Sequence, residues 1–376
     1  MNLILTINFF IIKFLLVQVQ NPIKQIPYIP SFGGTQIRWY ANRSSKLNLT
    51  VINQGLQMIS EKSCVQFVQE TFSPTSKVAP FIEFMDNTKV FLNNFNFNAT
   101  DDIMKSPLQL QIEYKCNKNP GCIAKKVLFS MGMAPTIRRN DRDKFITLNK
   151  TNIIDKYEKE FEILDKAKLY GTGYDYSSIG HASEYYRCLS AQSIFNTSIQ
   201  TYLTNVGQEY EPSFTDLKWL FYRFCSDQCT NTLKCQNGGF QNYDGCVYCD
   251  CPNGYSGDQC EKIENGTNCD IQTMLTATTQ NNSVTFSGAK LCNVLIKTDS
   301  GKKIKIVVGT GYLPSAYPCF EKKGLTIKYR KDKGLTGISF CTYVVHEELL
   351  SEDETVHIQY KGEKNNKITI TYQQVN

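Results

Sequence analysis

Helical and alternating patterns of apolar residues divide the chain into a mixed first part and a strand-rich last part. Leu49, Ile52 and Leu56 recur at helical spacing and predict a helix over Leu47–Lys62. Apolar and polar residues alternate along Leu108–Tyr114, which indicates a strand with one buried face. Other short apolar runs predict strands at Phe81–Phe84, Val90–Leu92, Val284–Phe286, Lys303–Val308, Leu325–Tyr329, Val356–Tyr360 and Lys367–Tyr372. Together these patterns predict a multidomain α+β protein.

Two further helices are expected between the early and the late strands. Val127, Leu128 and Met131 give the stretch Cys122–Phe145 an apolar face of helical type. A polar helix is expected near Ile153–Leu164.

Length, cysteine content and the first residues indicate a secreted protein of several domains. The chain has 376 residues, too many for one ordinary domain, and its 15 cysteines favour an oxidising compartment. Residues 1–20 are mostly apolar but interrupted by polar residues, so they predict a signal peptide and not a membrane span. No later apolar run reaches the roughly 18 residues that a span needs. The net charge of +6 is mild and gives no reason to expect a nucleic-acid partner.

Sequons agree with secretion to an extracellular location. The motif Asn-x-Ser/Thr marks acceptors for N-glycosylation in secreted proteins. It predicts glycosylation at Asn42, Asn48, Asn98, Asn149, Asn196, Asn265 and Asn281.

The stretch Cys122–Phe145 reads CIAKKVLFSMGMAPTIRRNDRDKF and resembles the zinc-binding motif HExxHxxGxxHExxRxDRD of the astacin metalloendopeptidases. Gly132 keeps the glycine of that motif, and the tail survives as Arg139, Asp141, Arg142 and Asp143. The resemblance implies that residues 21–227 form a zincin-like peptidase domain. It also implies the roles of the substituted positions: the three zinc ligands fall at Lys125, Phe129 and Pro135, and the catalytic glutamate falls at Lys126.

These four side chains suggest that the chemistry of the family is absent. Phe129 and Pro135 have no side-chain lone pair to donate, and Lys125 ligates only as a neutral amine. Lys126 repels a metal ion and does not activate water. We therefore expect no zinc cofactor and a protein that is not an enzyme.

A second segment supports the resemblance to astacins. Tyr174–Ala182 reads YDYSSIGHA and resembles the family segment YDYxSxMHY. Gly180 stands at the methionine of the turn below the metal, and Ala182 stands at the tyrosine that approaches it. His181 keeps its place, but the family does not use this histidine as a ligand. We expect His181 to be a packing or hydrogen-bonding residue.

Cysteine spacing after the first domain resembles two extracellular modules. Residues 228–261, with glycine turns at Gly238-Gly239 and Gly254–Gly257, resemble an EGF-like domain. Residues 269–374 resemble a CUB domain, which is a β-sandwich. The resemblances imply the disulfides Cys64–Cys225, Cys229–Cys246, Cys235–Cys249, Cys251–Cys260, Cys269–Cys292 and Cys319–Cys341.

Three cysteines remain outside these pairs. Cys116 lies six residues before Cys122, so the two can pair with each other. Cys188 is then either a free thiol or the site of an intermolecular disulfide.

Two groups of basic residues leave alternatives open. Lys125 and Lys126 either belong to a helix whose role is to pack its apolar face into the core, or they form a positive floor of the cleft that holds a carboxylate. Nine basic residues of the last module form either a solvated face or a site for an acidic glycan. They are Lys302, Lys303, Lys305, Lys322, Lys323, Lys328, Arg330, Lys331 and Lys333.

The sequence predicts a secreted, catalytically inactive astacin homologue that acts as an extracellular binding or scaffold protein. Its partner is expected to be an extracellular protein or an acidic glycan. The alternative is a zinc metalloendopeptidase that cleaves extracellular proteins with a non-standard metal site. Zinc content and chelator-sensitive peptide cleavage distinguish the two.

Overall fold

The computed structural model describes residues 35–42, 44–73, 76–89 and 103–376. The expected signal peptide at residues 1–20, the start of the predicted peptidase domain, the strand expected at Val90–Leu92 and the sequon at Asn98 lie outside these residues. No helix in the described residues is long and apolar enough to cross a membrane.

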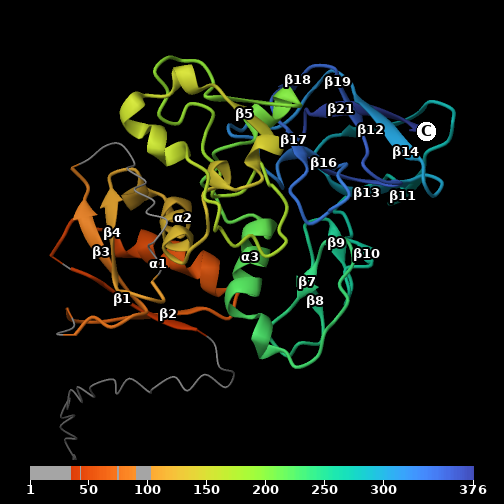
Figure 1. Ribbon diagram of the computed structural model, residues 1–376. Helices are drawn as coiled ribbons and strands as arrows, with labels where there is room; N and C mark the ends of the chain where they lie inside the picture. Colours follow the sequence, from red (N-terminus) through yellow and green to blue (C-terminus); the bar gives the residue numbers. More distant parts are fainter. Residues whose placement is uncertain (1–34, 43, 74–75, 90–102) are drawn as a thin grey trace, which may run out of the picture. The chain divides into compact units, whose positions relative to one another are not determined.

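The first part of the described chain is a parallel sheet with helices (Figure 1). Its strands are β1 (Gln36–Ala41), β2 (Gln66–Gln69), β3 (Phe81–Asn87) and β4 (Leu108–Glu113), in the order β2-β1-β3-β4. β3 is the most buried strand, because Phe81, Ile82 and Phe84 all enter the core. β4 is the strand expected at Leu108–Tyr114, and it begins at the expected residue.

Two helices pack beside this sheet, and a glycine allows their close approach. The helix expected at Leu47–Lys62 is α1 (Leu49–Ser60), and the second helix is α2 (Pro120–Ser130). A Cβ atom on Gly55 of α1 would lie 2.6 Å from the Cβ atom of Ile123 in α2. Any larger residue at position 55 would push the two helices apart.

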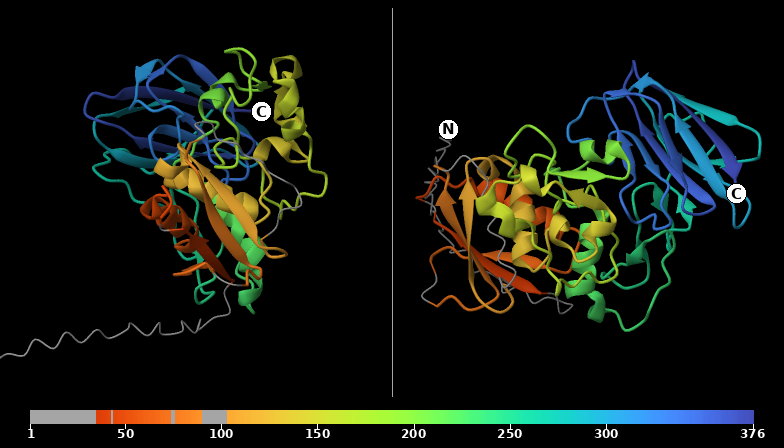
Figure 2. Two further views of the ribbon diagram at one scale, coloured as in Figure 1. Left: turned by 90° about the vertical axis from the view of Figure 1, so that its left-hand side faces the viewer. Right: turned by 45° about the horizontal axis from the view of Figure 1, so that its top comes forward.

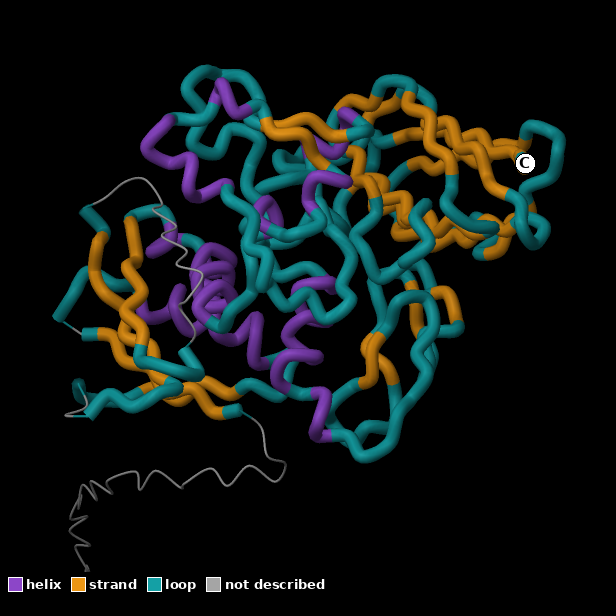
Figure 3. Tube along the Cα trace, in the orientation of Figure 1, coloured by secondary structure: helices purple, strands orange, loops and turns teal. Residues whose placement is uncertain are grey.

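The chain between α2 and α3 (Phe214–Phe224) is mostly loop with short helices, as the tube in Figure 3 shows. The strands β5 (Ile146–Leu148) and β6 (Phe195–Thr197) form a small antiparallel pair. The polar helix expected near Ile153–Leu164 is a 3-10 helix at Asp155–Phe161, because its polar sequence supplies no long apolar face. The other 3-10 helices here are Thr136–Arg138, Arg142–Lys144, Lys150–Asn152 and Gln200–Thr204.

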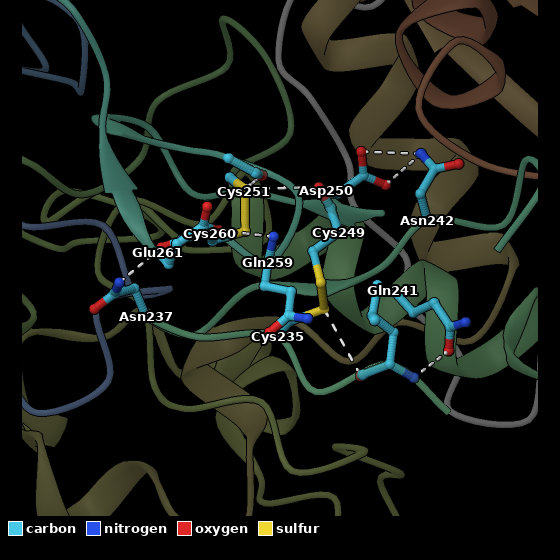
Figure 4. The surroundings of a disulfide bond; sticks show 12 residues. Cys235, Asn237, Gln241, Asn242, Cys249, Asp250, Cys251, Gln259, Cys260 and Glu261 are labelled. Carbon is cyan, nitrogen blue, oxygen red and sulfur yellow. Dashed lines mark hydrogen bonds between the residues drawn. A yellow bond between two sulfur atoms is a disulfide. The ribbon is translucent and has the colours of Figure 1, made fainter. Parts of the chain in front are cut away.

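A disulfide-rich segment at residues 229–263 follows α3. Its two hairpins pair β7 (Phe240–Gln241) with β8 (Cys249–Asp250), and β9 (Tyr255–Ser256) with β10 (Lys262–Ile263). Figure 4 shows the Cys235–Cys249 disulfide, with Asn242 Nδ2 donating to both carboxylate oxygens of Asp250 at 3.0 and 2.9 Å. With so few apolar residues in its core cluster, the segment depends on its disulfides for stability.

The last part, residues 269–376, is here named the C-terminal β region. One sheet has the order β11-β13-β20-β16-β17, and the other has the order β18-β15-β21-β14-β19 with β12 paired to β21. Apolar residues of both sheets form one shared core, and Figure 2 shows the two sheets in further views. The strands are β11 (Met274–Thr276), β12 (Asn282–Ser287), β13 (Leu291–Lys297), β14 (Lys303–Val308), β15 (Gly311–Tyr312), β16 (Gly324–Lys328), β17 (Ile338–Phe340), β18 (Tyr343–Val344), β19 (Glu347–Leu350), β20 (Thr355–Lys361) and β21 (Lys367–Val375).

Polar contacts join the C-terminal β region to the first part of the chain. Asn205 Nδ2 donates to Ser339 O at 2.8 Å, and Ser339 N donates back to Asn205 Oδ1 at 2.9 Å. Arg330 Nη1 donates to Tyr174 O at 2.8 Å. These bonds end on buried or partly buried atoms, so they fix the two parts against each other.

Seven disulfides cross-link the described residues. The pairs are Cys64–Cys225, Cys116–Cys122, Cys229–Cys246, Cys235–Cys249, Cys251–Cys260, Cys269–Cys292 and Cys319–Cys341. Cys188 keeps a free thiol. This content of disulfides is consistent with folding in an oxidising compartment.

Candidate functional site

A cleft of about 370 Å³ opens beside α2. Lys125 and Phe129 of α2 line it, and so does Pro135 in the turn that follows. Gly180 and Ala182, from a segment far along the chain, line it as well. The structure therefore brings together five of the positions that the resemblance to astacins had singled out in two separate motifs.

Local sequence features place α2 at this cleft. Asn119 caps the helix, because its side chain accepts hydrogen bonds from the N–H groups of Gly121 and Cys122. A Cβ atom on Gly121 would lie 2.0 Å from the carbonyl oxygen of Glu209, a residue that also lines the cleft. Glycine at position 121 thus lets the segment around Glu209 approach the first turn of α2.

The turn after α2 depends on a second glycine and on two arginines. Gly132 has a φ of +96°, a conformation that favours glycine. Arg139 makes two hydrogen bonds to the Asp141 carboxylate, at 2.9 and 2.8 Å, and a third to Thr172 O. Arg142 donates to Ile137 O at 2.7 Å. These bonds hold the chain in the path that returns Pro135 to the cleft.

The side chains at the three positions aligned with zinc ligands do not fit a zinc ion. Lys125 Nζ lies 3.4 Å from Glu209 Oε1, so its ammonium has a carboxylate beside it. Phe129 and Pro135 have no side-chain donor atom. In the part of the chain that the structure describes, no group of three or more His, Cys, Asp or Glu side chains could hold a metal ion. No reaction step through a metal is assigned to these residues.

Lys126 does not line the cleft, although it follows Lys125 directly. Its ammonium lies 3.0 Å from Glu113 Oε2, and both side chains are buried. Burial lowers the pKa of Lys126, and the Glu113 carboxylate opposes that change. Of the two lysines only Lys125 reaches the cleft, so the pair does not form the positive floor that was considered.

His181 is a buried structural residue behind the cleft. Its Nδ1 lies 2.8 Å from Ala182 O, and a carbonyl oxygen only accepts, so Nδ1 carries the proton. Nε2 then accepts a hydrogen bond from the Tyr174 hydroxyl at 2.9 Å. Burial lowers the pKa of His181 to about 4, so the ring is neutral at pH 7. With both nitrogens engaged, His181 is placed to support the loop of Gly180 and Ala182.

Asp216 supports the same loop from α3. It accepts hydrogen bonds from Ser178 Oγ at 2.6 Å and from Ile179 N at 2.8 Å. It also forms a capping box with Ser213 at the start of α3. Burial raises the pKa of Asp216 to about 6.

Charged residues form the walls of the cleft, and most of their charge is paired. Arg187 Nε lies 3.2 Å from Glu160 Oε2, which also accepts a hydrogen bond from Tyr186. Arg138 Nε donates to Glu162 O at 2.8 Å, and burial lowers its pKa. Sequence reasoning missed Glu160, Glu209 and Arg187, because no motif spacing links them to α2. The resulting cleft has an apolar floor and polar, charged walls.

A family model and curated relatives match this chain. The family model of Astacin, which describes a peptidase family, matches residues 32–225. Zinc metalloproteinase nas-34 of Caenorhabditis elegans is 26% identical over 338 residues, which cover 89% of this chain and 54% of that protein. Zinc metalloproteinase nas-30 of the same organism is 29% identical, with coverage of 65% and 33%. The chain thus spans about half or less of the length of these relatives.

Among solved structures, high choriolytic enzyme 1 of Oryzias latipes, a hatching enzyme zinc-protease, is 20% identical with a TM-score of 0.41. The similarity covers 50% of this chain and 87% of that one.

These similarities correct two expectations from the sequence. We expected a protein that is not an enzyme and that has no zinc cofactor. The matching family is a peptidase family, and both relatives are named zinc metalloproteinases, which contradicts both expectations. The expectations rested mainly on the residue types at Lys125, Phe129, Pro135 and Lys126, whereas metal ligands and catalytic groups are assembled in a folded chain from several segments.

Proposed function

The chain belongs to the astacin family of peptidases, and from this premise we propose that its cleft binds an extended polypeptide segment of an extracellular protein. The cleft itself carries the proposal. Its volume of about 370 Å³ lies within the range of specific ligand sites, and it is built at the position of the family motif.

The chemistry of the cleft favours a peptide with an apolar side chain. Phe129, Pro135 and Ala182 offer that side chain an apolar floor. Lys125 and Glu209 on the walls offer a donor and an acceptor for the polar backbone of the peptide. β4 ends two residues before Lys115, which also lines the cleft, so an extended segment can bind alongside this edge.

An extracellular setting is part of the same proposal. The sequon residues Asn42, Asn48, Asn196, Asn265 and Asn281 are exposed. We propose that the disulfide-rich segment is an EGF-like domain and that the C-terminal β region is a CUB domain, following their cysteine patterns.

A protein partner is favoured over an acidic glycan. Of the nine basic residues considered for a glycan site, five form ion pairs with carboxylates: Lys305, Lys322, Lys328, Arg330 and Lys333. Lys328 and Lys333 are also buried. Pairing and burial therefore reduce the positive charge that this region offers to a sulfated or carboxylated glycan.

The test is to fill the cleft. In Ala182→Phe a larger side chain occupies the space that we assign to the ligand, while Ala191→Phe makes the same change at an exposed loop position. The probe is a set of fluorescent, terminally capped octapeptides with one fixed central phenylalanine. We expect fluorescence polarisation to show binding to the wild type and to Ala191→Phe, with affinity at least about tenfold lower for Ala182→Phe. Equal binding by Ala182→Phe, or no binding by the wild type, would refute the proposal.

The family match favours a second function, hydrolysis of the bound polypeptide. The same octapeptides, incubated with the protein and zinc chloride, are analysed by mass spectrometry with and without 1,10-phenanthroline. Cleavage that the chelator abolishes, and that Ala182→Phe reduces, supports the peptidase function. Retained binding with intact peptides under all conditions contradicts it.

A further inference from the structure

A loop of the C-terminal β region lies against the segment that forms one side of the cleft. This loop, residues 313–323, connects β15 and β16. Cys319 N donates to Thr204 O at 2.7 Å, and the ring of Phe320 stacks on Tyr210 with 4.2 Å between centroids. The neighbours of Tyr210 in the chain include residues that line the cleft. The loop therefore packs against the segment that carries Gly207 and Glu209 of the cleft.

Tyr317 of this loop is fixed to the rim of the cleft through a buried carboxylate. Its hydroxyl donates to Glu184 Oε1 at 2.6 Å. Glu184 is only 9% exposed, and it lies between Ser183 and Tyr185, which both line the cleft. The Glu184 charge raises the pKa of Tyr185, and burial followed by the same carboxylate raises the pKa of Tyr317. Both tyrosines thus lie close to one negative charge.

The rings of the two tyrosines are open to solvent although the carboxylate is not. Tyr317 is 60% exposed and Tyr185 is 46% exposed. Donation of a hydroxyl proton to a carboxylate increases the electron density of the ring, and the face of such a ring attracts cations. None of the ion pairs between described residues involves Glu184. Its charge therefore acts on a cation through the two exposed tyrosines and not by direct contact.

We propose that Tyr185, Tyr317 and Glu184 form a recognition site for a lysine or arginine side chain of the polypeptide bound in the cleft. The inference rests on the proposed function, because Tyr185 belongs to both the cleft and this site. The negative charge of Glu184 favours a basic residue of the peptide. Because Tyr185 also lines the cleft, this basic residue lies near the apolar side chain of the peptide that contacts the floor of the cleft. The C-terminal β region then takes part in selecting the ligand, since it supplies Tyr317.

The experiment compares matched peptides on matched variants of the full chain. The probes are capped octapeptides with a fixed phenylalanine and with arginine or norleucine placed one to three residues to either side. Tyr317→Leu removes the aromatic face, and Glu184→Gln removes the charge while keeping the size of the side chain. Tyr248→Leu is the control, because Tyr248 is an exposed tyrosine of the disulfide-rich segment. Dissociation constants come from fluorescence polarisation.

For at least one arginine position, we expect the wild type and Tyr248→Leu to bind the arginine peptide about three- to tenfold more tightly than the norleucine peptide. Tyr317→Leu and Glu184→Gln should bring this ratio close to one, with the affinity for the norleucine peptide unchanged. Binding of the peptides without a preference for arginine overturns the inference and leaves the proposed function standing. A preference that survives in both variants also overturns it, and absence of all peptide binding overturns the proposed function together with the inference.

Discussion

Replacing Lys126 by methionine tests whether this lysine is part of the core. The ammonium of Lys126 lies 3.0 Å from the carboxylate of Glu113, whose side chain is 1% exposed. Methionine keeps most of the apolar stem and removes the charge. Breaking a buried ion pair at one partner costs about 3–5 kcal/mol, because the other charge stays in a poorly solvated site.

Proton uptake by the carboxylate sets an upper limit on this cost. For a glutamate with the reference pKa of about 4.3, protonation costs about 4 kcal/mol at pH 7.4 and about 1.6 kcal/mol at pH 5.5. Lys126→Met should therefore lower the free energy of unfolding by about 3–4 kcal/mol at pH 7.4. At pH 5.5 the loss should fall below about 2 kcal/mol.

Guanidinium unfolding followed by tryptophan fluorescence measures this effect in the correct part of the molecule. The two tryptophans, Trp39 and Trp219, belong to the same core cluster as the apolar residues of α2. Lys364→Met, at an exposed position, should change the free energy of unfolding by less than about 0.5 kcal/mol. The double variant Lys126→Met with Glu113→Gln should recover most of the loss. The reasoning is wrong if Lys126→Met is as stable as the control, if its loss does not depend on pH, or if the double variant is no more stable than the single one.

Two further predictions concern stability. Burial lowers the pKa of His357 to about 3. Between pH 3 and about pH 6.5 the unfolded state therefore binds more protons at this residue than the folded state does. The contribution of His357 to stability should consequently fall on acidification. As the pH falls from 7.5 to 5, the free energy of unfolding of His357→Leu should therefore rise by about 2 kcal/mol relative to that of the wild type. Guanidinium titrations measure this, and a difference in the free energy of unfolding that does not change with pH would contradict the prediction. The Cys64–Cys225 disulfide closes a loop with a sequence separation of 161 residues. The double variant Cys64→Ala with Cys225→Ala should lose up to about 5 kcal/mol in the same assay, and an unchanged midpoint would show that the disulfide does not restrict the unfolded chain.

Local patterns of residues were enough to predict the family and much of the secondary structure. Apolar periodicity predicted the helix around Leu49–Ser60 and the strand that begins at Leu108. An element that buries one face needs apolar residues at its own structural period, so the spacing of these residues identifies it. Two short motifs indicated the family and pointed to Lys125, Phe129 and Pro135. The same positions, read alone, led to the wrong expectations about catalysis and zinc, because a motif records residue types and not the full set of groups in the folded site.

The surroundings of these residues depend on the folded chain. Successive helical residues point about 100° apart, and packing against β4 turns Lys126 into the core while Lys125 stays at the cleft. Glu160 and Glu209 reach the cleft through loops without a regular period, and Tyr317 meets Glu184 across 133 residues of sequence. Contacts of this kind depend on how separate elements dock, and docking is set by the shape and burial of whole surfaces. A local pattern of residues therefore does not predict how these elements dock.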